Sequence, residues 1–300
     1  MTPSRVGVLW GQMRRPVLYH APTSYNSQIV RLALREKGVS WKSHVMNIER
    51  DHENARPRYL RLNPEGSVPT FTHKDITLTD AITIALYINN NFPGPMLAPS
   101  NEKEIKLMEQ WVTLAHQFPD RELALGGLSG FGQKLALKNL EKRKSLIQAL
   151  EEKNEDLSAV YKATYEKTLK LQALIGDSHV RNSAVIRVDQ MLEMAEEAVK
   201  RSTWLAGDDY SLADICWTII LARLDYLGLK ELWTHTRPNL TGYYQRARAR
   251  PSFRKARIPM KAPKGAHLRD IMNVYGWARA AVWAIIIVFL AAAGWAVWNF

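Results

Sequence analysis

The spacing of apolar residues changes near residue 100. Before this point strand-like runs alternate with helical stretches, and after it the spacing is helical throughout. Apolar or alternating residues first form short strand-like runs at 16–20, 41–48, 70–73 and 76–79. Apolar residues at helical spacing occupy the stretch that ends at Gly38 and the stretch that begins at Asp80. This β-α-β order, followed by β-β-α, predicts an α/β domain over residues 16–98.

Beyond a linker at 99–101, the apolar residues recur at helical spacing. The expected helices lie at 105–118, 135–175, 183–200 and 212–227, with a last one that starts at 237–244. Glycines between Leu123 and Phe131 interrupt the pattern and predict a flexible elbow. The sequence therefore predicts an all-helical domain over 102–258, with an insertion at about 119–182.

The helix expected at 135–175 is long enough to raise the question of a coiled coil. Leu150, Leu157, Thr164 and Leu171 recur at intervals of seven, which amounts to only about two clean heptads. We therefore expect this helix to pack on its own domain rather than to form a dimer.

Ser211 and Asp214 have the spacing of a capping box at the start of an apolar helix. Such a motif starts a buried helix, so its expected role is in folding. Cys216 lies in the same helix and is expected to be a core residue rather than a nucleophile.

A turn motif at 61–71 joins the helical stretch before it to a strand. It contains Val68-Pro69, where the proline begins the strand. If this bond is cis, the backbone N–H and C=O of Val68 turn away from the sheet and can bind a peptide-like ligand. An ordinary turn proline is the alternative.

The net charge of +12 has a local origin. Nine basic residues and no acidic one lie between Arg246 and Arg269, and without them the net charge falls from +12 to +3. The single cysteine excludes an internal disulfide and fits a reducing compartment. No signal peptide is recognisable at the N-terminus.

The run Ala280–Trp298 contains 19 uncharged residues. As a helix it would be about 28 Å long, close to the hydrocarbon thickness of a bilayer. We predict a transmembrane tail anchor at 276–298 and a basic juxtamembrane segment at 246–275 that contacts anionic lipid. A buried soluble helix is the alternative for the span. Nucleic-acid binding is the rival use of the basic run, and we do not expect it.

The chain resembles the cytosolic glutathione transferase superfamily over residues 16–258. The resemblance rests on the motifs Leu18-Tyr-His, Ser24-Tyr-Asn-Ser-Gln-Ile-Val-Arg, Leu62-Asn-Pro-x-Gly-x-Val-Pro69 and Leu205-x-Gly-x-x-Tyr-Ser-Leu-Ala-Asp214. It is most similar to the tail-anchored ganglioside-induced differentiation-associated proteins, with plant dehalogenase-like transferases as near competitors. The resemblance implies a thioredoxin-like domain, a helical domain, and a glutathione site between them.

The resemblance also assigns site residues. Ser24 falls where a hydroxyl hydrogen-bonds the glutathione thiolate, although it is equally well placed to cap a helix. Val68, with Pro69, would pair with the cysteinyl backbone, and Asp80 would meet the γ-glutamyl ammonium. Tyr25 is a fallback donor, as is Tyr19 within the first strand. No metal ligand set is expected.

Two departures from the family pattern weaken an enzymatic reading. Ala81 stands where the family has a serine for the γ-glutamyl carboxylate. Ser67 stands where a longer polar or cationic side chain often meets the glycyl carboxylate. A helix N-terminus at Asp80 still offers N–H groups to an anion.

Two functions therefore stay open. One is a membrane-anchored glutathione transferase that acts on a hydrophobic electrophile. The other is a catalytically weak binding protein that organises membranes, as in mitochondrial fission. The expected partners are glutathione, a hydrophobic small molecule and membrane lipid, and a homodimer is compatible with both functions. The resemblance places the soluble part in the cytosol, on the outer mitochondrial membrane of a eukaryote or the inner (plasma) membrane of a bacterium.

Overall fold

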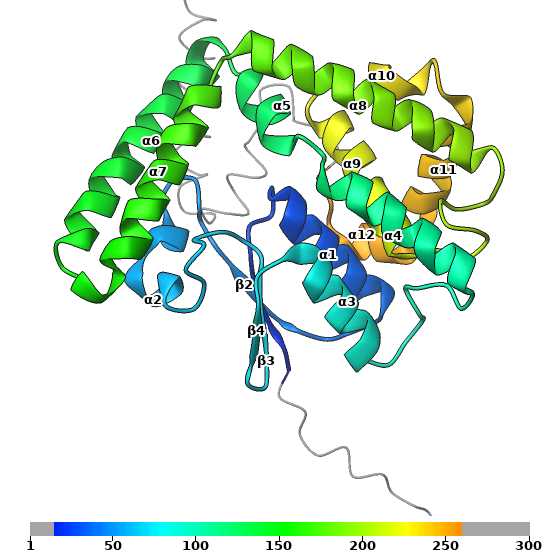
Figure 1. The fold of residues 1–300 in the computed structure, drawn as a ribbon, viewed down its shortest axis with the longest axis horizontal. Helices are drawn as coiled ribbons and strands as arrows, with labels where there is room; N and C mark the ends of the chain where they lie inside the picture. Colours follow the sequence, from blue (N-terminus) through cyan, green and yellow to red (C-terminus); the bar gives the residue numbers. More distant parts are fainter. Residues whose placement is uncertain (1–14, 260–300) are drawn as a thin grey trace, which may run out of the picture.

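The computed structural model describes residues 15–259 and begins with an α/β domain (Figure 1). Its elements are β1 (Val17–His20), α1 (Tyr25–Glu36), β2 (Lys42–Val45), a 3-10 turn (Glu53–Ala55), α2 (Pro57–Leu60), β3 (Thr70–His73), β4 (Ile76–Leu78) and α3 (Ala81–Asn91). The sheet order is β2-β1-β3-β4, with β1 parallel to β2 and antiparallel to β3. The predicted thioredoxin-like domain is confirmed.

The two faces of the sheet carry different helices because successive side chains of a strand point to opposite sides. Leu18 of β1 lies in a core with α1 and α3, together with Val30, Phe71 and Ile84. The neighbouring Tyr19 packs on the other face, against a cluster of Ala21, Met46, Tyr59 and Val68. The second cluster joins α2 to the loop that precedes β3.

The predicted helical domain follows and is also confirmed. Its elements are α4 (Glu102–His116), α5 (Asp120–Gly126), α6 (Gly130–Glu151), a 3-10 turn (Glu155–Leu157), α7 (Ser158–Leu174), α8 (Ser178–Val199), α9 (Leu212–Tyr226), α10 (Glu231–Thr234), α11 (Pro238–Ala249) and α12 (Pro251–Ala256). Helix α9 lies at the centre and is buried from Leu212 to Leu224. Trp217 of α9 meets Trp111 of α4 edge-on, with ring centroids 5.1 Å apart.

The predicted capping box at the start of α9 is confirmed. One carboxylate oxygen of Asp214 accepts hydrogen bonds from the backbone N–H and the hydroxyl of Ser211, at 2.8 and 2.9 Å. The other accepts from the N–H of Leu205 at 2.9 Å and the hydroxyl of Tyr243 at 3.0 Å. Burial raises the pKa of Asp214 to about 6. Cys216 is fully buried, as expected of a core residue.

The prediction of one long helix over 135–175 is wrong. Helices α6 and α7 form a helical hairpin, which stands beside α2 (Figure 1). The stretch 151–156 is polar throughout, so it provides no buried face to continue the helix. By folding back, the chain brings Ile147, Leu157 and Tyr161 into one cluster with Ala55 and Leu60 of the α/β domain.

The elbow expected at 123–131 is shorter than predicted: only residues 127–129 are non-helical, between α5, which ends at Gly126, and α6, which begins at Gly130. The glycines allow close packing instead. A Cβ atom on Gly126 would lie 2.8 Å from the carbonyl oxygen of Asp177. One on Gly127 would lie 2.8 Å from Nε of Arg181.

Between residues 15 and 259, no helix has both the length and the apolar character needed to cross a bilayer. The predicted span at Ala280–Trp298 lies outside the described residues, as does most of the predicted basic segment 246–275. The first part of that segment belongs to the helical domain rather than to a separate linker. Arg250 forms two hydrogen bonds of 2.8 Å with the carboxylate of Glu36, so its charge is already paired.

We expect Asp214→Ala to destabilise the protein by about 3 kcal/mol or more, because it leaves several buried donors without an acceptor. Chemical denaturation followed by tryptophan fluorescence would measure the loss. Asp209→Ala is the matched control, since Asp209 is exposed in the loop that precedes α9, and it should change the free energy of unfolding by less than about 0.5 kcal/mol. Equal effects of the two substitutions would contradict the capping role.

Candidate functional site

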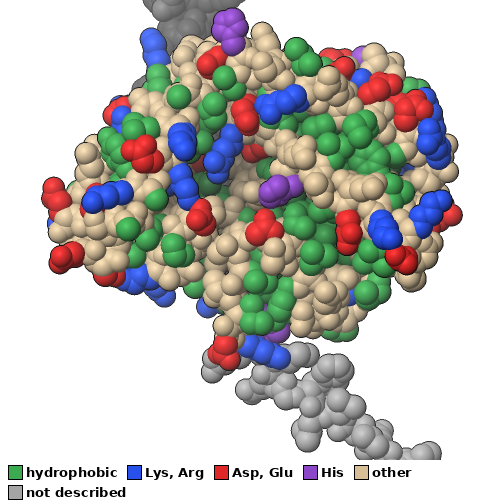
Figure 2. Space-filling model, viewed as in Figure 1, with side chains coloured by type: hydrophobic (Ala, Val, Ile, Leu, Met, Phe, Trp, Pro, Cys, Tyr) green, Lys and Arg blue, Asp and Glu red, His purple; other side chains and the backbone are tan. Residues whose placement is uncertain are grey.

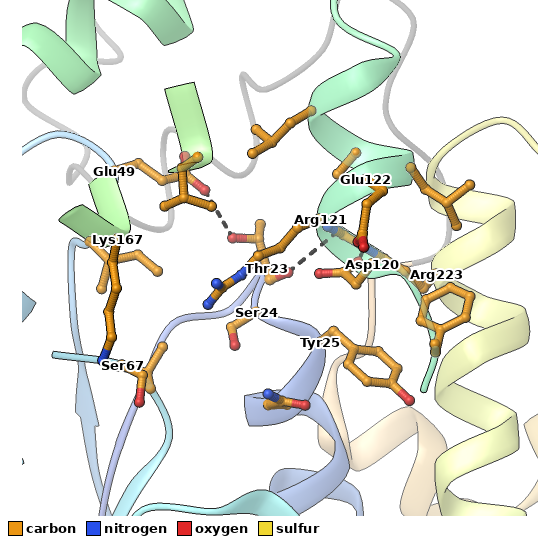
Figure 3. Close-up of a pocket in the computed structure, with 18 of the residues that line it drawn as sticks. Thr23, Ser24, Tyr25, Glu49, Ser67, Asp120, Arg121, Glu122, Lys167 and Arg223 are labelled. Carbon is orange, nitrogen blue, oxygen red and sulfur yellow. Dashed lines mark hydrogen bonds and ion pairs between the residues drawn. The ribbon is translucent and has the colours of Figure 1, made fainter. Parts of the chain in front are cut away.

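Ser24 lies at the turn from β1 to α1 and lines a cleft between the two domains (Figure 3). It is the N-cap of α1, and its Oγ accepts a hydrogen bond from the N–H of Ser27 at 3.3 Å. That contact uses a lone pair of the oxygen. No described residue accepts from the hydroxyl, so its hydrogen is available to a ligand. The capping role and a donor role are therefore compatible at Ser24.

Neighbouring side chains fix the turn that carries Ser24. The carbonyl of Pro22 accepts hydrogen bonds from Gln28 and Arg31 at 3.2 and 3.1 Å. The carbonyl of Thr23 accepts one from Arg223 of α9 at 3.4 Å. Arg223 also pairs with Asp120 of α5 at 2.5 Å, as Figure 3 shows. The helical domain thus holds the turn from the far side of the cleft.

The Val68-Pro69 bond is cis, which is the first of the two alternatives that the sequence left open. Among the described residues, neither the N–H nor the C=O of Val68 has a hydrogen-bond partner, although Val68 lines the cleft. Side chains of the α/β domain fix the loop that carries Val68. The carbonyl of Ser67 accepts hydrogen bonds from the Tyr59 hydroxyl at 2.5 Å and the Asn63 amide at 2.9 Å. Val68 therefore presents a fixed donor and acceptor pair to the cleft.

Asp80 caps α3 and lines the same cleft. Its Oδ1 accepts hydrogen bonds from the N–H and the hydroxyl of Thr83, at 2.7 and 2.8 Å. Both contacts use one oxygen, and the carboxylate is exposed. The other oxygen can therefore meet an ammonium group. Ala81, the next residue, is buried and supplies no polar side-chain atom.

The two tyrosines named as fallback donors have other contacts. The Tyr25 hydroxyl donates to the carbonyl of Ala115 at 3.3 Å, and its ring packs on Phe118 with centroids 5.2 Å apart. Burial raises the pKa of Tyr25 well above its ordinary value. Tyr19 packs against Tyr59 on the sheet face beneath α2. Thr23 of the same turn also lines the cleft, but its hydroxyl donates to Glu49 at 3.2 Å. Among the described residues, Ser24 is thus the hydroxyl of this turn whose hydrogen has no acceptor.

The cleft has a volume of about 880 Å³. Its walls are the β1–α1 turn, the loop before β3, helix α5 and the inner face of the α6–α7 hairpin. Figure 2 shows a hollow in the middle of this face of the molecule, with Lys and Arg side chains gathered beside it. The walls are partly apolar, with Leu123, Leu128, Leu140, Leu171 and Ile175. The space and its lining suit a small organic ligand.

The α6–α7 hairpin is bonded directly to the loop that carries Val68. Arg143 of α6 donates to Oδ1 of Asn54 at 3.0 Å, and the amide of Asn54 donates to the carbonyl of Gly66 at 2.6 Å. Arg143 also donates to Thr168 of α7 at 3.2 Å. A buried arginine thus links both helices of the hairpin to the α/β domain.

Sequence reasoning missed this wall because it placed the hairpin residues on a single helix. A signal was nevertheless available. Arg143 falls on the same helical face as Ala136, Leu140 and Ile147, so it is a charged residue in an apolar stripe. A charge in such a position is expected to have a specific partner.

Within residues 15–259, no group of three or more His, Cys, Asp or Glu side chains could hold a metal ion. The chemistry available to the described site therefore comes from a hydroxyl, a fixed backbone pair, a carboxylate and arginines.

Two family models match the chain. The glutathione S-transferase N-terminal domain matches residues 18–96, and the C-terminal domain matches residues 176–251. A tetrachloro-p-hydroquinone reductive dehalogenase of Sphingobium chlorophenolicum is 30% identical, over 80% of this chain and 95% of that protein. The human ganglioside-induced differentiation-associated protein 1-like 1 is 26% identical, over 80% of this chain and 72% of that protein.

Solved structures share the fold. The β-etherase of a Sphingobium strain aligns with a TM-score of 0.64 at 21% identity, over 80% of this chain and 98% of that one. The two family models leave residues 97–175 uncovered, and this interval contains the whole α6–α7 hairpin.

A double-mutant cycle tests the link between the hairpin and the loop. We expect a coupling free energy of about 1–2 kcal/mol between Asn54→Ala and Arg143→Met, because each substitution leaves the other partner's buried group unpaired. Urea denaturation of the four proteins measures it. The matched control pairs Asn54→Ala with Lys142→Met, an exposed residue of the same helix, and its coupling should be near zero. A coupling near zero in the first cycle would show that the contact does not hold the hairpin.

Proposed function

Because this chain belongs to the glutathione S-transferase superfamily, whose members use glutathione as co-substrate, we propose that it joins glutathione to hydrophobic electrophiles. The proposal rests on two groups that line the same cleft. They are the Ser24 hydroxyl at the N-terminus of α1, whose hydrogen has no acceptor among the described residues, and the backbone N–H and C=O of Val68, which have no partner among them either. An apolar wall across the cleft supports an apolar second substrate.

Ser24 would act by stabilising the thiolate of glutathione. The thiolate is the nucleophile, and a donor that favours the charged sulfur lowers the thiol pKa. The N-terminus of α1 adds to this effect, because its unpaired N–H groups also favour a negative charge. No acidic side chain lies in the first turn of α1 to oppose it. At neutral pH, more of the bound glutathione is then ionised and reactive.

Val68 and Asp80 would orient the tripeptide. The backbone N–H and C=O of Val68 suit the backbone of a cysteinyl residue, as in the addition of a short strand. The exposed oxygen of Asp80 suits the γ-glutamyl ammonium. The missing hydroxyl at Ala81 leaves the N–H groups of α3 to meet the γ-glutamyl carboxylate.

A binding protein without turnover is the second candidate, and Ala81 is the observation that favours it. One relative, the ganglioside-induced differentiation-associated protein 1-like 1, carries a name that states no enzymatic activity. Membrane organisation of this kind would use the hairpin or the basic segment for partners. A homodimer stays a prediction under either function.

We also propose that the run Ala280–Trp298 attaches the protein to a membrane, with the helical domain on the cytosolic side. The proposal rests on the length and composition of this run and on the basic residues that precede it. An electrophile that partitions into lipid would then be concentrated beside the cleft. Which membrane is used stays a prediction.

Replacing Ser24 tests the transferase activity. Ser24→Ala should lower kcat/KM for glutathione and an aryl halide by roughly 10- to 100-fold, the worth of one hydrogen bond to a charged group. It should also move the rise of kcat/KM with pH to higher pH, because the bound thiol loses its stabilising donor. Stopped-flow absorbance over pH 5.5–9 measures both effects.

The matched control for the cap is Ser24→Gly. Glycine retains most of the N-cap stability that alanine loses, so the two variants should differ in stability but share the kinetic defect. Tight calorimetric binding of glutathione with no turnover in the wild type would favour the binding protein instead. Full activity of Ser24→Ala would remove Ser24 from the mechanism.

Two lysines test the membrane span. Ile286→Lys with Leu290→Lys should release the protein from membranes into the alkaline carbonate supernatant, because each charge costs about 3 kcal/mol at the centre of a spanning helix. Asn299→Lys adds a charge outside the run and should leave the protein in the membrane pellet. Release of the wild-type protein by carbonate would contradict the anchor.

A further inference from the structure

Three arginines line the cleft without a carboxylate partner among the described residues. They are Arg121 of α5, Arg143 of α6 and Arg181 of α8. Lys167 pairs with Glu65, and Arg223 with Asp120. Of the other carboxylates that line the cleft, Glu122 pairs with Arg187, and Glu49 accepts a hydrogen bond from the hydroxyl of Thr23 on the α/β side. The hairpin side of the cleft therefore carries positive charge that the described protein does not neutralise.

Arg181 differs from the other two because it lies against the end of α5. A Cβ atom on Gly127, the residue after α5, would lie 2.8 Å from Nε of Arg181 and 3.1 Å from the carbonyl oxygen of Leu123. The side chain of Arg181 therefore lies near the last carbonyl groups of α5. A helix C-terminus favours a cation, so Arg181 has a structural explanation. Arg121 and Arg143 have no comparable one.

Arg143 is only 9% exposed, and its partners are neutral. It donates to Asn54 and to Thr168, and neither brings a negative charge. Burial, with the nearby charge of Arg121, lowers the pKa of Arg143 to about 10. A buried guanidinium without a counter-ion is costly, so an anion that enters the cleft would be stabilised there.

Arg121 extends into the cleft from the first turn of α5. Figure 3 shows its guanidinium in the space between Ser24 and the hairpin, pointing away from Asp120. The side chain is exposed, and it forms no hydrogen bond or ion pair with any described residue. It is thus a free cation directed at the place where the proposed reaction would occur.

We propose that Arg121 and Arg143 form an anion site on the helical side of the cleft, which binds the carboxylate of an organic acid. The inference rests on the proposed function, because it places this acid beside the thiolate. Two sources share this chemistry. One is the glycyl carboxylate of glutathione, and the other is an acidic group on the second substrate.

The geometry relates each arginine to one source. Arg143 reaches the loop of Val68 through Asn54 and Gly66, so it lies on the side of Val68 where an extended tripeptide would place its glycine if Asp80 holds the other end. It would supply the cation that Ser67 does not. Arg121 stands over Ser24 and would meet an acid carried by the electrophile. Both residues come from the interval that the family models leave uncovered.

Matched pairs of ligands test the site without relying on turnover. Calorimetry measures binding of glutathione against its glycinamide, and of 4-chloro-3-nitrobenzoate against 4-chloro-3-nitrobenzamide, the latter pair without glutathione. The proteins are wild type, Arg121→Gln, Arg143→Gln and Arg201→Gln. Arg201 is exposed, lies outside the cleft and controls for the lost charge.

At least one acid should bind the wild type about tenfold or more tightly than its amide. Arg121→Gln or Arg143→Gln should remove that preference, while Arg201→Gln keeps it. If the preference for glutathione over its glycinamide is lost, the glycyl carboxylate is the occupant of the site. If the preference for the benzoate over the benzamide is lost, the occupant is an acidic group of the second substrate. If Arg143→Gln does not fold, the benzoate pair with the exposed Arg121→Gln still tests the site. Equal binding of acid and amide in both pairs, or a preference unchanged by either substitution, overturns the site.

Turnover of the benzamide is measured separately and reports on the proposed function. If the protein does not accelerate the reaction of the benzamide with glutathione over the uncatalysed rate, the transferase proposal fails. The preference for acid over amide is decided by calorimetry alone.

Discussion

Helix α1 is packed from both sides, and the rest of the structure depends on that constraint. One face contacts the sheet and α3 through Val30 and Leu34, and the other contacts the helical domain through Ile29 and Leu32. At its C-terminal end, Glu36 is fixed by Arg250 and Ser252. The N-terminus of α1 therefore has one position relative to both domains. Because Ser24 caps that end, the same packing that joins the domains also places the candidate donor.

The hairpin α6–α7 adds a wall to a two-domain cleft. Its contacts to the α/β domain combine an apolar cluster around Tyr161 with the polar chain from Arg143 to Gly66. Outer ion pairs such as Arg61–Asp156 are exposed and contribute little to stability by comparison. The hairpin therefore rests on the loop that presents Val68. A change in the hairpin's packing would be felt at the position proposed for glutathione.

The charge distribution of the cleft follows from this architecture. Among the described residues that line it, Asp80 of the α/β domain has no basic partner and Arg121 and Arg143 of the helical domain have no acidic one, whereas Glu65, Asp120 and Glu122 are paired. A ligand with an ammonium at one end and a carboxylate at the other matches this polarity, and glutathione has both groups. Charged groups in a partly enclosed cleft interact more strongly than on an open surface, because less water screens them. The proposed contacts would thus hold such a ligand in one orientation.

The sequence by itself determined the elements whose signals are local. The β-α-β and β-β-α order, the capping box of Asp214, the cap at Ser24 and the punctuation around Val68-Pro69 all depend on residues within a few positions of one another. The family resemblance added the residues expected to bind glutathione, because those motifs keep fixed spacings. The cis form of Val68-Pro69 was one of two alternatives that the sequence left open, and the structure has it.

Tertiary structure alone decided how distant segments meet. The recurrence of Leu150, Leu157 and Leu171 at multiples of seven fits both one long helix and a folded hairpin. The polar stretch 151–156 permits a break, and the apolar surface at Ala55 and Leu60 gives the folded hairpin something to cover. The pairing of Arg143 with Asn54 joins residues 89 positions apart, so no local pattern could reveal it. The ion pair of Arg250 with Glu36 is also a contact between distant parts of the sequence. Because of it, Arg250 joins the two domains, although the sequence placed this residue in a segment expected to contact lipid. Local periodicity fixes which face of a helix is apolar, whereas the surface that covers this face depends on the whole fold.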